Sequence, residues 1–237
     1  LLDRSALTTA VRDVGTVIHI AAWHGIHESS RSASDFYDLN VTGTFNVLQA
    51  AIEAGAKHFV FMSSTSVMDQ YGVYGHSKLL AESLVEAYAH RHGLSCVILR
   101  PRAFIPPWNR QTYKNFLEWT DWFMKGAVHI NDLLEATLIA IDHRPTRPAP
   151  IYIIDGAYDY SALELENWDN SGAGSTFAAR YASYVELACK HGLKTHIKPR
   201  VLDIPPDQLL PQYTPRYSVL SLLKELELYG ADGPPEP

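Results

Sequence analysis

Three short apolar segments rich in β-branched residues constrain the fold of this chain more than any other feature. They read TVIHIAA, KHFVFMSS and LSCVILRP, at residues 16–22, 57–64 and 94–101. Continuous apolar runs of this length are typical of parallel strands that are covered on both faces. Two segments with apolar residues at helical spacing separate these runs, and they end at Gly55 and Gly93. The alternation predicts an α/β fold with a doubly wound, Rossmann-type parallel sheet.

The chain is less regular after Pro101. Residues 102–126 are rich in aromatic side chains and contain proline. Beyond them the pattern predicts a strand, a helix capped by asparagine and a further strand, at 126–130, 131–142 and 151–155. We expect residues 1–155 to form a partial Rossmann-type domain, with 102–126 contributing to a second lobe. Residues 156–237 are expected to form that smaller C-terminal lobe.

The composition argues against several classes of partner. The chain of 237 residues has a net charge of −6 and no basic run, which disfavours nucleic acid and anionic membranes. No apolar stretch reaches the roughly 18 to 20 residues that a membrane span needs. Cys96 and Cys189 are too few for a disulfide framework, and the first residues lack the pattern of a signal peptide. We therefore expect a protein of the cytoplasm.

Tyr74 and Lys78 carry the most suggestive chemistry, because they lie four residues apart at the start of a predicted helix. This spacing puts both side chains on one face, with Cβ atoms about 6 Å apart. An ammonium about 5 Å from a phenolic oxygen favours phenolate by roughly 3 kcal/mol at an effective dielectric constant near 20. We therefore expect Lys78 to lower the pKa of Tyr74 by about two units, toward proton exchange at neutral pH. The pair alone is weak support, because a surface lysine after a core tyrosine has the same spacing.

The order of the surrounding motifs makes the pair specific. The chain reads VIHIAA, then NVTGTFNVLQAA, then SSTSV at the end of a strand, then YGHSK, then LRP, and later VHINDLLEA. This succession resembles the extended short-chain dehydrogenase/reductases, the NAD-dependent epimerase/dehydratase family, strongly over residues 1–155. In that family V-I-H-L-A-A precedes N-V-x-G-T-x-N-(V/L)-L-x-A-A, a strand ending S-S-x-x-V, Y-x-x-x-K and L-R-P.

The resemblance implies an NAD(P)-dependent sugar epimerase or dehydrogenase/reductase, with a nucleotide-linked sugar as the expected substrate. It slightly favours epimerase chemistry, and NAD over NADP. Residues 1–155 would bind the dinucleotide, and the C-terminal lobe would bind the substrate. A homodimer is expected, paired through the two long helices that follow Gly43 and Tyr74. A non-catalytic NAD(P)-binding regulatory protein of the same fold remains the alternative.

Position by position, the resemblance implies three sets of site residues. Tyr74 would be the general acid/base, Lys78 would lower its pKa and hold the nicotinamide ribose, and Ser64 would bond the reacting oxygen. The cofactor would contact residues from four segments, namely Ala21, Ala22, Trp23, Asn40, Ser63, Tyr74, Lys78 and Pro101. The substrate would contact Ser64, Thr65, His24, Ala103 and Lys125. For Asn40, Ser63 and the two alanines, plain packing is the alternative.

The sequence also departs from the family pattern. It contains no G-x-x-G-x-x-G, the motif whose amides cradle pyrophosphate at a helix N-terminus, and in the family that segment would precede Leu1. The loop between Ser64 and Tyr74 is shorter than the family's. Ala103 replaces an asparagine that often contacts substrate phosphates, and Lys125 stands where the family often has a phosphate-binding arginine.

Three further features have competing interpretations. His24, His27 and Glu28 have metal-ligand chemistry, but such a group in a loop is usually a solvated turn, so we predict no metal site. The aromatic set Phe116, Trp119, Trp122 and Phe123 is more typical of a core than of a platform for a sugar ring. Residues 168–177, which read WDNSGAGSTF, are expected to form a flexible substrate lid.

Overall fold

The computed structural model describes residues 1–69, 72–170 and 175–236. Its strands are β1 (Thr16–His19), β2 (His58–Met62), β3 (Ser95–Pro101) and β4 (Ile151–Ile154). The α-helices are α1 (Arg4–Ala10), α2 (Ala33–Phe36), α3 (Gly43–Glu53), α4 (Val73–His92), α5 (Phe116–Phe123), α6 (Ile130–Asp142), α7 (Ala162–Asn170), α8 (Ser175–Arg180), α9 (Val185–His191) and α10 (Val219–Tyr229). A π-helix, η2 (Tyr37–Thr42), joins α2 to α3. Short 3-10 helices are η1 (Gly25–His27), η3 (Thr65–Met68), η4 (Ala182–Tyr184), η5 (Pro206–Gln208) and η6 (Gly230–Asp232).

The chain divides into two compact units, and each consists of three segments. The first unit contains residues 1–102, 135–154 and 204–213, and the second contains 103–134, 155–203 and 214–237. Residues 204–213 therefore belong with the sheet, whereas the pattern of the sequence had placed them in the C-terminal lobe. The middle of the expected lid, residues 171–174, lies outside the described residues.

The first unit is built on a parallel sheet whose strand order is the order of the chain, β1-β2-β3-β4. Val17 pairs with Phe59, Phe59 with Cys96, and Ile98 with Ile151, so each apolar run lies beside the next one. This arrangement confirms the predicted α/β fold with a Rossmann-type parallel sheet.

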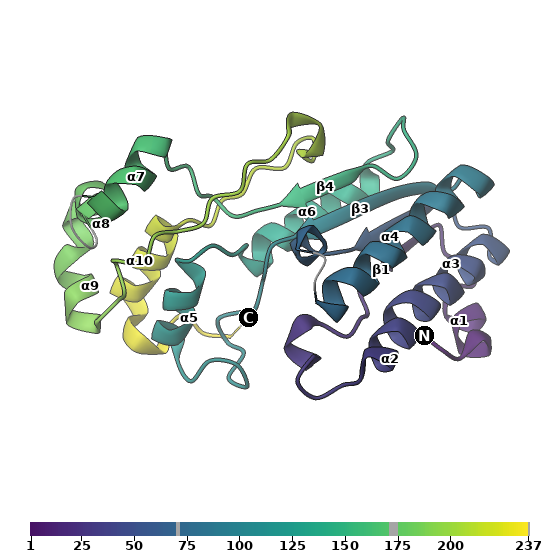
Figure 1. Ribbon diagram of the computed structural model, residues 1–237, viewed down its shortest axis with the longest axis horizontal. Coiled ribbons are helices and arrows are strands. Elements are labelled where there is room, and N and C mark those ends of the chain that lie inside the picture. Colours follow the sequence, from purple (N-terminus) through teal and green to yellow (C-terminus); the bar gives the residue numbers. More distant parts are fainter. Residues whose placement is uncertain (70–71, 171–174, 237) are drawn as a thin grey trace. The chain divides into compact units, whose positions relative to one another are not determined.

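Helices cover both faces of this sheet (Figure 1). Phe59 and Phe61 of β2 pack with Leu48 of α3 and Val85 of α4 on one face. On the other face His58 reaches α6, where its Nε2 lies 2.8 Å from the carbonyl oxygen of Ala140. β2 is buried along its whole length. Its sequence is a continuous apolar run because both faces of the strand are covered.

The helix ends follow local sequence signals in most places. Asp3 caps α1 by accepting a hydrogen bond from the Ala6 amide, and Gly93 ends α4 with φ +64°. The strand expected at 126–130 is wrong. Instead, the amide of Val128 donates to the carbonyl of Ala103, and α6 already begins at Ile130. The amide of Ala127 donates to the Tyr158 hydroxyl rather than to a neighbouring strand, so no ladder forms here.

An aromatic core holds the second unit together. Phe116, Trp119 and Phe123 of α5 are at most 1% exposed and pack against Leu222 and Leu226 of α10. The Trp119 indole N–H donates to a backbone carbonyl 2.7 Å away, so its polar atom is also satisfied. The core interpretation therefore holds for Phe116, Trp119 and Phe123, whose buried rings cannot stack on a sugar, whereas Trp122 is half-buried against this core.

Candidate active site

The carboxyl ends of the parallel strands bring the predicted site residues of the first unit to one edge of the sheet. Residues 21–23 follow β1, and Ser63 and Ser64 follow β2. Helix α4 then begins beside them with Tyr74 in its first turn. Such an edge is where open α/β sheets bind ligands.

Tyr74 lies close enough to Ser64 at this edge for the serine side chain to lower the pKa of its phenol. Ser64 also fixes the turn η3, because its Oγ accepts from the amide of Ser66 at 3.1 Å. The amide of Tyr74 donates to Glu28 Oε1 at 2.9 Å, so a carboxylate caps the first turn of α4. Each of the two hydroxyl-bearing residues is therefore held by a hydrogen bond that a backbone amide donates.

Gly75 allows α4 to approach η3 closely. A Cβ at this position would lie 2.3 Å from the carbonyl oxygen of Ser66, which is far inside a normal contact. Any other residue would push the start of α4 away from the turn that carries Ser64. The short distance between Tyr74 and Ser64 thus depends on a glycine that carries no chemistry itself.

The pKa of Tyr74 does not move as the spacing had suggested. Burial raises the pKa of Tyr74, and the hydrogen bond from Ser64 opposes this only in part. The expected lowering by Lys78 is wrong, since the ammonium does not contribute to the shift. Helical spacing fixes the Cβ atoms, but the head groups point to different surroundings, and desolvation decides the sign.

Lys78 lies in the core rather than at the surface. Its side chain is 2% exposed, and its Nζ sits 4.2 Å from the centre of the Phe61 ring. Burial lowers the pKa of Lys78 to about 7, although the charge of Glu82 raises it. The surface interpretation of this lysine is therefore excluded, and its charge is poised to change near neutral pH.

Asn40 ties the loop after β1 to the first turns of α4. Its Oδ1 accepts from the Trp23 amide at 2.8 Å, and its Nδ2 donates to the Trp23 carbonyl at 3.0 Å and to Ser77 Oγ at 2.9 Å. Asn40 is 1% exposed and belongs to the π-helix η2, a distortion that is frequent at functional sites. The Asn40 side chain therefore fixes the backbone of Trp23 relative to α4.

His24 faces the candidate site, whereas its neighbours are used locally. Its ring centroid lies 5.8 Å from that of Tyr74, and burial, followed by the charge of Lys78, lowers its pKa. His27 Nδ1 accepts from the His24 amide, and Glu28 caps α4. Among the described residues no three or more His, Cys, Asp or Glu side chains form a group able to hold a metal ion.

The remaining predicted residues are spread over both units. Thr65 is half-buried at the start of η3, Ala21 is exposed, and Ala22 is half-buried. Pro101 is buried at the end of β3 beside Ile154. Ala103 and Lys125 are exposed side chains of the second unit.

The sequence patterns missed a buried polar network directly behind Lys78. Ser63, a predicted cofactor contact, donates its hydroxyl to Glu82, and Glu82 also pairs with Arg100. The repeat of four from Tyr74 to Lys78 to Glu82 was a usable signal, since all three must lie on one face of α4.

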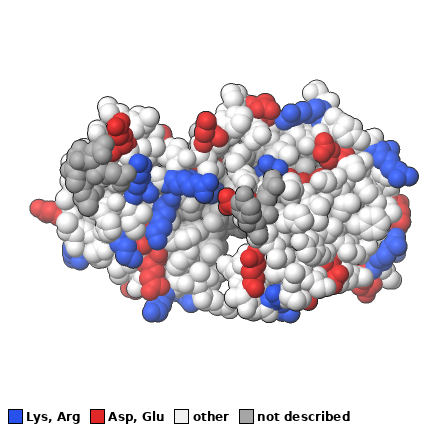
Figure 2. Space-filling view, viewed as in Figure 1, with Lys and Arg blue, Asp and Glu red and all other residues white. Residues whose placement is uncertain are grey.

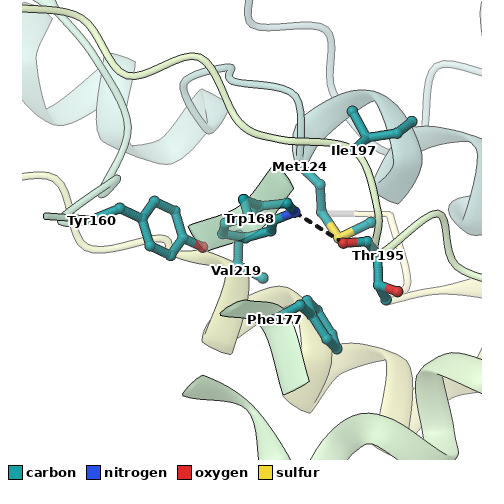
Figure 3. A pocket seen from close by; sticks show the side chains of 7 residues that line it. All are labelled: Met124, Tyr160, Trp168, Phe177, Thr195, Ile197 and Val219. Carbon is teal, nitrogen blue, oxygen red and sulfur yellow. Dashed lines mark hydrogen bonds between the residues drawn. The ribbon is translucent and has the colours of Figure 1, made fainter. Parts of the chain in front are cut away.

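No helix among residues 1–69, 72–170 and 175–236 has the length and apolar character to cross a membrane. Figure 2 shows basic and acidic side chains interspersed on the face that it presents. A cavity in the second unit, lined by Met124, Tyr160, Trp168, Phe177, Thr195, Ile197 and Val219, has about 10 Å³, room for one water at most (Figure 3). It is a packing defect and too small for a substrate.

Comparison with known proteins agrees with this geometry. The model of the NAD dependent epimerase/dehydratase family matches residues 1–154. The UDP-glucose 4-epimerase of Erwinia amylovora is 26% identical over 230 residues, covering 75% of this chain and 67% of the relative. The UDP-glucose 4-epimerase of Vibrio cholerae is 23% identical and covers 65% and 56% of the two chains. The chain thus spans about two thirds or less of the length of these curated relatives.

Solved structures share the fold at low sequence identity. MoeE5 in complex with UDP-glucuronic acid and NAD has a TM-score of 0.66 at 20% identity, covering 94% of this chain and 81% of its own. UDP-glucuronic acid 4-epimerase from Bacillus cereus in complex with NAD has a TM-score of 0.65 at 19% identity, covering 94% and 75%. With a family model that matches residues 1–154, the chain belongs to the NAD-dependent epimerase/dehydratase family.

Proposed function

We propose that this chain carries the catalytic part of an NAD(P)-dependent epimerase or dehydrogenase/reductase that acts on a nucleotide-linked sugar. The observation that carries the proposal is the placement of Tyr74 against Ser64, with the amine of Lys78 buried one helical turn further on. These groups lie at the carboxyl edge of a parallel sheet, where ligands of such folds bind. A purely structural tyrosine would need neither a hydroxyl partner at this edge nor a buried amine.

The residues present fit the nicotinamide half of the cofactor. Ala21 to Trp23 leave small or half-exposed side chains after β1, and Lys78 and Tyr74 supply an amine and a phenol beside them. Ala21, Ala22, Asn40, Ser63 and Pro101 complete the proposed contact set, with Ser63 and Asn40 acting from the buried side. A bound nicotinamide nucleotide would supply the hydride acceptor. NAD is preferred over NADP, in line with the NAD complexes of the structural neighbours.

Tyr74 and Ser64 act on the substrate oxygen in this proposal. The Tyr74 phenolate takes the proton of a substrate hydroxyl when that carbon becomes a carbonyl and its hydride passes to the bound nicotinamide, and the Tyr74 phenol returns the proton in the reverse step. Ser64 donates a hydrogen bond to the same oxygen, with Thr65 beside it. Because burial keeps the Tyr74 phenol protonated at neutral pH, the site is set to donate a proton first. Activity in the oxidising direction should therefore rise with pH.

The substrate class rests on the relatives and on a few exposed side chains. Relatives include UDP-glucose 4-epimerases and an L-arabinose 1-dehydrogenase, so both reaction types occur among them. We favour epimerase chemistry, since epimerases predominate among these relatives. His24 faces the site near Tyr74, and we assign Ala103 and Lys125 to the substrate side. A homodimer through α3 and α4 remains a prediction, which sedimentation of the complete protein would test.

The test compares two tyrosine variants on the same helix. NAD or NADP binding is measured by calorimetry, and turnover is measured with UDP-glucose and UDP-glucuronic acid on the complete polypeptide. Tyr74→Phe should reduce turnover at least a hundredfold while nucleotide affinity holds. Tyr88→Phe is the matched control, because the Tyr88 ring lies further along the same helix and packs against Phe45 and His92.

Each outcome separates the alternatives. An epimerase converts the sugar with no net change in cofactor, whereas a dehydrogenase/reductase changes the absorbance at 340 nm, a wavelength that reports reduced nicotinamide. Nucleotide binding without turnover of either sugar would support the regulatory alternative. Turnover by Tyr74→Phe within twofold of the unmodified protein would remove Tyr74 from the mechanism.

A further inference from the structure

Glu82 is a buried carboxylate one helical turn beyond Lys78 on α4. It is 4% exposed, and the spacing of four places it on the same helix face as Lys78 and Tyr74. An ionised carboxylate at such depth is costly unless several groups bond it. The groups that bond the Glu82 carboxylate therefore indicate its role.

Two residues at the ends of neighbouring strands hold the Glu82 carboxylate. Arg100 of β3 donates from Nε to Oε1 at 2.9 Å and from Nη2 to Oε2 at 2.6 Å, a bidentate pair. Ser63, which follows β2, donates its hydroxyl to Oε1. The carboxylate thus has a fixed orientation, and it links α4 to the edge of the sheet where the site lies.

Lys78 has little other compensation for its charge. Its Nζ lies over the Phe61 ring, and burial is the main cause that lowers its pKa. His19 of β1 and His24 after β1 both have pKa values lowered by burial and by the charge of Lys78, so both are neutral neighbours at pH 7. Glu82 is the group that raises the pKa of Lys78.

We propose that Glu82 is a positioning residue that keeps the Lys78 ammonium charged, and that Arg100 and Ser63 hold its carboxylate for this purpose. The inference rests on the proposed function, in which the Lys78 amine contacts the cofactor, because it explains how a lysine in the core can stay charged. We expect Arg100 to act in the opposite sense from Glu82, because its own positive charge offsets part of the carboxylate. Burial lowers the pKa of Lys78 and Glu82 raises it, so the carboxylate determines how much of the Lys78 charge remains near neutral pH.

A purely structural role for Glu82 makes a different prediction. If the carboxylate only ties α4 to β3, removal of Glu82 or of Arg100 breaks the same link and should have the same effect. If it acts through charge, the two changes should move the protonation of Lys78 in opposite directions. This difference in sign can be measured without any substrate.

The experiment follows the Lys78 side-chain nitrogen by NMR as a function of pH, in the complete protein labelled with 15N-lysine. The signal is assigned by its loss in Lys78→Met. A unit charge at about 6 Å and an effective dielectric constant near 20 corresponds to roughly two pKa units. We expect Glu82→Gln to shift the Lys78 midpoint down by one to two units, and Arg100→Met to shift it up. Glu82→Asp, which retains the charge, should stay near the unmodified protein.

The outcomes are decisive for this proposal alone. Equal midpoints in Glu82→Gln and the unmodified protein, or shifts of the same sign in Glu82→Gln and Arg100→Met, would overturn it. Should Glu82→Gln fail to fold, Arg100→Met and Glu82→Asp still test the sign and the need for charge. The proposed function fails separately, through unchanged turnover in Tyr74→Phe, so the two failures cannot be confused.

Discussion

Replacement of Gly75 by alanine tests whether the close approach of α4 to η3 builds the site. The new Cβ would lie 2.3 Å from the Ser66 carbonyl oxygen, so helix and turn must separate by about 1 Å to reach a normal contact. Overpacking of this kind costs about 1–3 kcal/mol, and the better helix propensity of alanine returns about 0.5–1 kcal/mol. The expected net loss of local stability is about 1–2 kcal/mol, which increases the open population 5- to 30-fold.

Hydrogen exchange read by mass spectrometry measures this effect in each unit separately. Peptides from α4 should exchange 5- to 30-fold faster in Gly75→Ala, while peptides from α10 in the second unit should be unchanged. Gly15→Ala is the matched control, since nothing lies within 4 Å of a Cβ there and its backbone does not require glycine. Turnover should fall about a hundredfold, because a 1 Å displacement of Tyr74 from Ser64 spoils the geometry. Unchanged exchange in α4 of Gly75→Ala would refute the packing argument.

Three further predictions concern buried polar groups. Asn40→Ala should destabilise the first unit by about 2–4 kcal/mol in urea denaturation, because both backbone groups of Trp23 lose their partner. Burial lowers the pKa of His129 from 6.5 to about 4, so unfolding takes up a proton between these values. The contribution of His129 to the free energy of unfolding of the second unit is fully present above pH 6.5 and falls by about 1.4 kcal/mol per pH unit between pH 6.5 and about 4. This slope, measured by fluorescence-monitored unfolding, should be smaller in His129→Gln. Trp168→Phe should cost about 1 kcal/mol through the lost bond to the Thr195 carbonyl, and an unchanged unfolding midpoint would contradict that contribution.

The sheet was predictable from sequence, since its signals are local. A strand buried on both faces needs a continuous apolar run, and His58–Met62 and Ser95–Pro101 are buried for this reason. Caps such as Asp3 and stops such as Gly93 depend on one residue and its own backbone. Residues 126–130 do not form a strand because no strand lies beside them. The sequence of the segment itself cannot show whether a partner strand is present.

The site was predictable in its members more than in its electrostatics. Ordered motifs predicted Ser64, Tyr74 and Lys78 as site residues; the structure places Ser64 near Tyr74, and the catalytic roles of all three stay predictions. The sign of the Tyr74 pKa shift could not be predicted, because it depends on how much water the fold excludes. Glu82 was missed for the same reason, since a glutamate on a helix is usually exposed and only its partner on β3 shows otherwise.

The way the chain alternates between its two units has a consequence for its synthesis. Residues 204–213 complete the unit that begins at Leu1, with η5 beside β4 and Asp207 within 3.8 Å of Arg147. The first unit is therefore complete only after the synthesis of a segment that lies some fifty residues beyond the end of β4 at Ile154. A fragment that ends at Ile154 would keep the four described strands but lack residues 204–213 of the first unit. The first unit should therefore be produced together with the second.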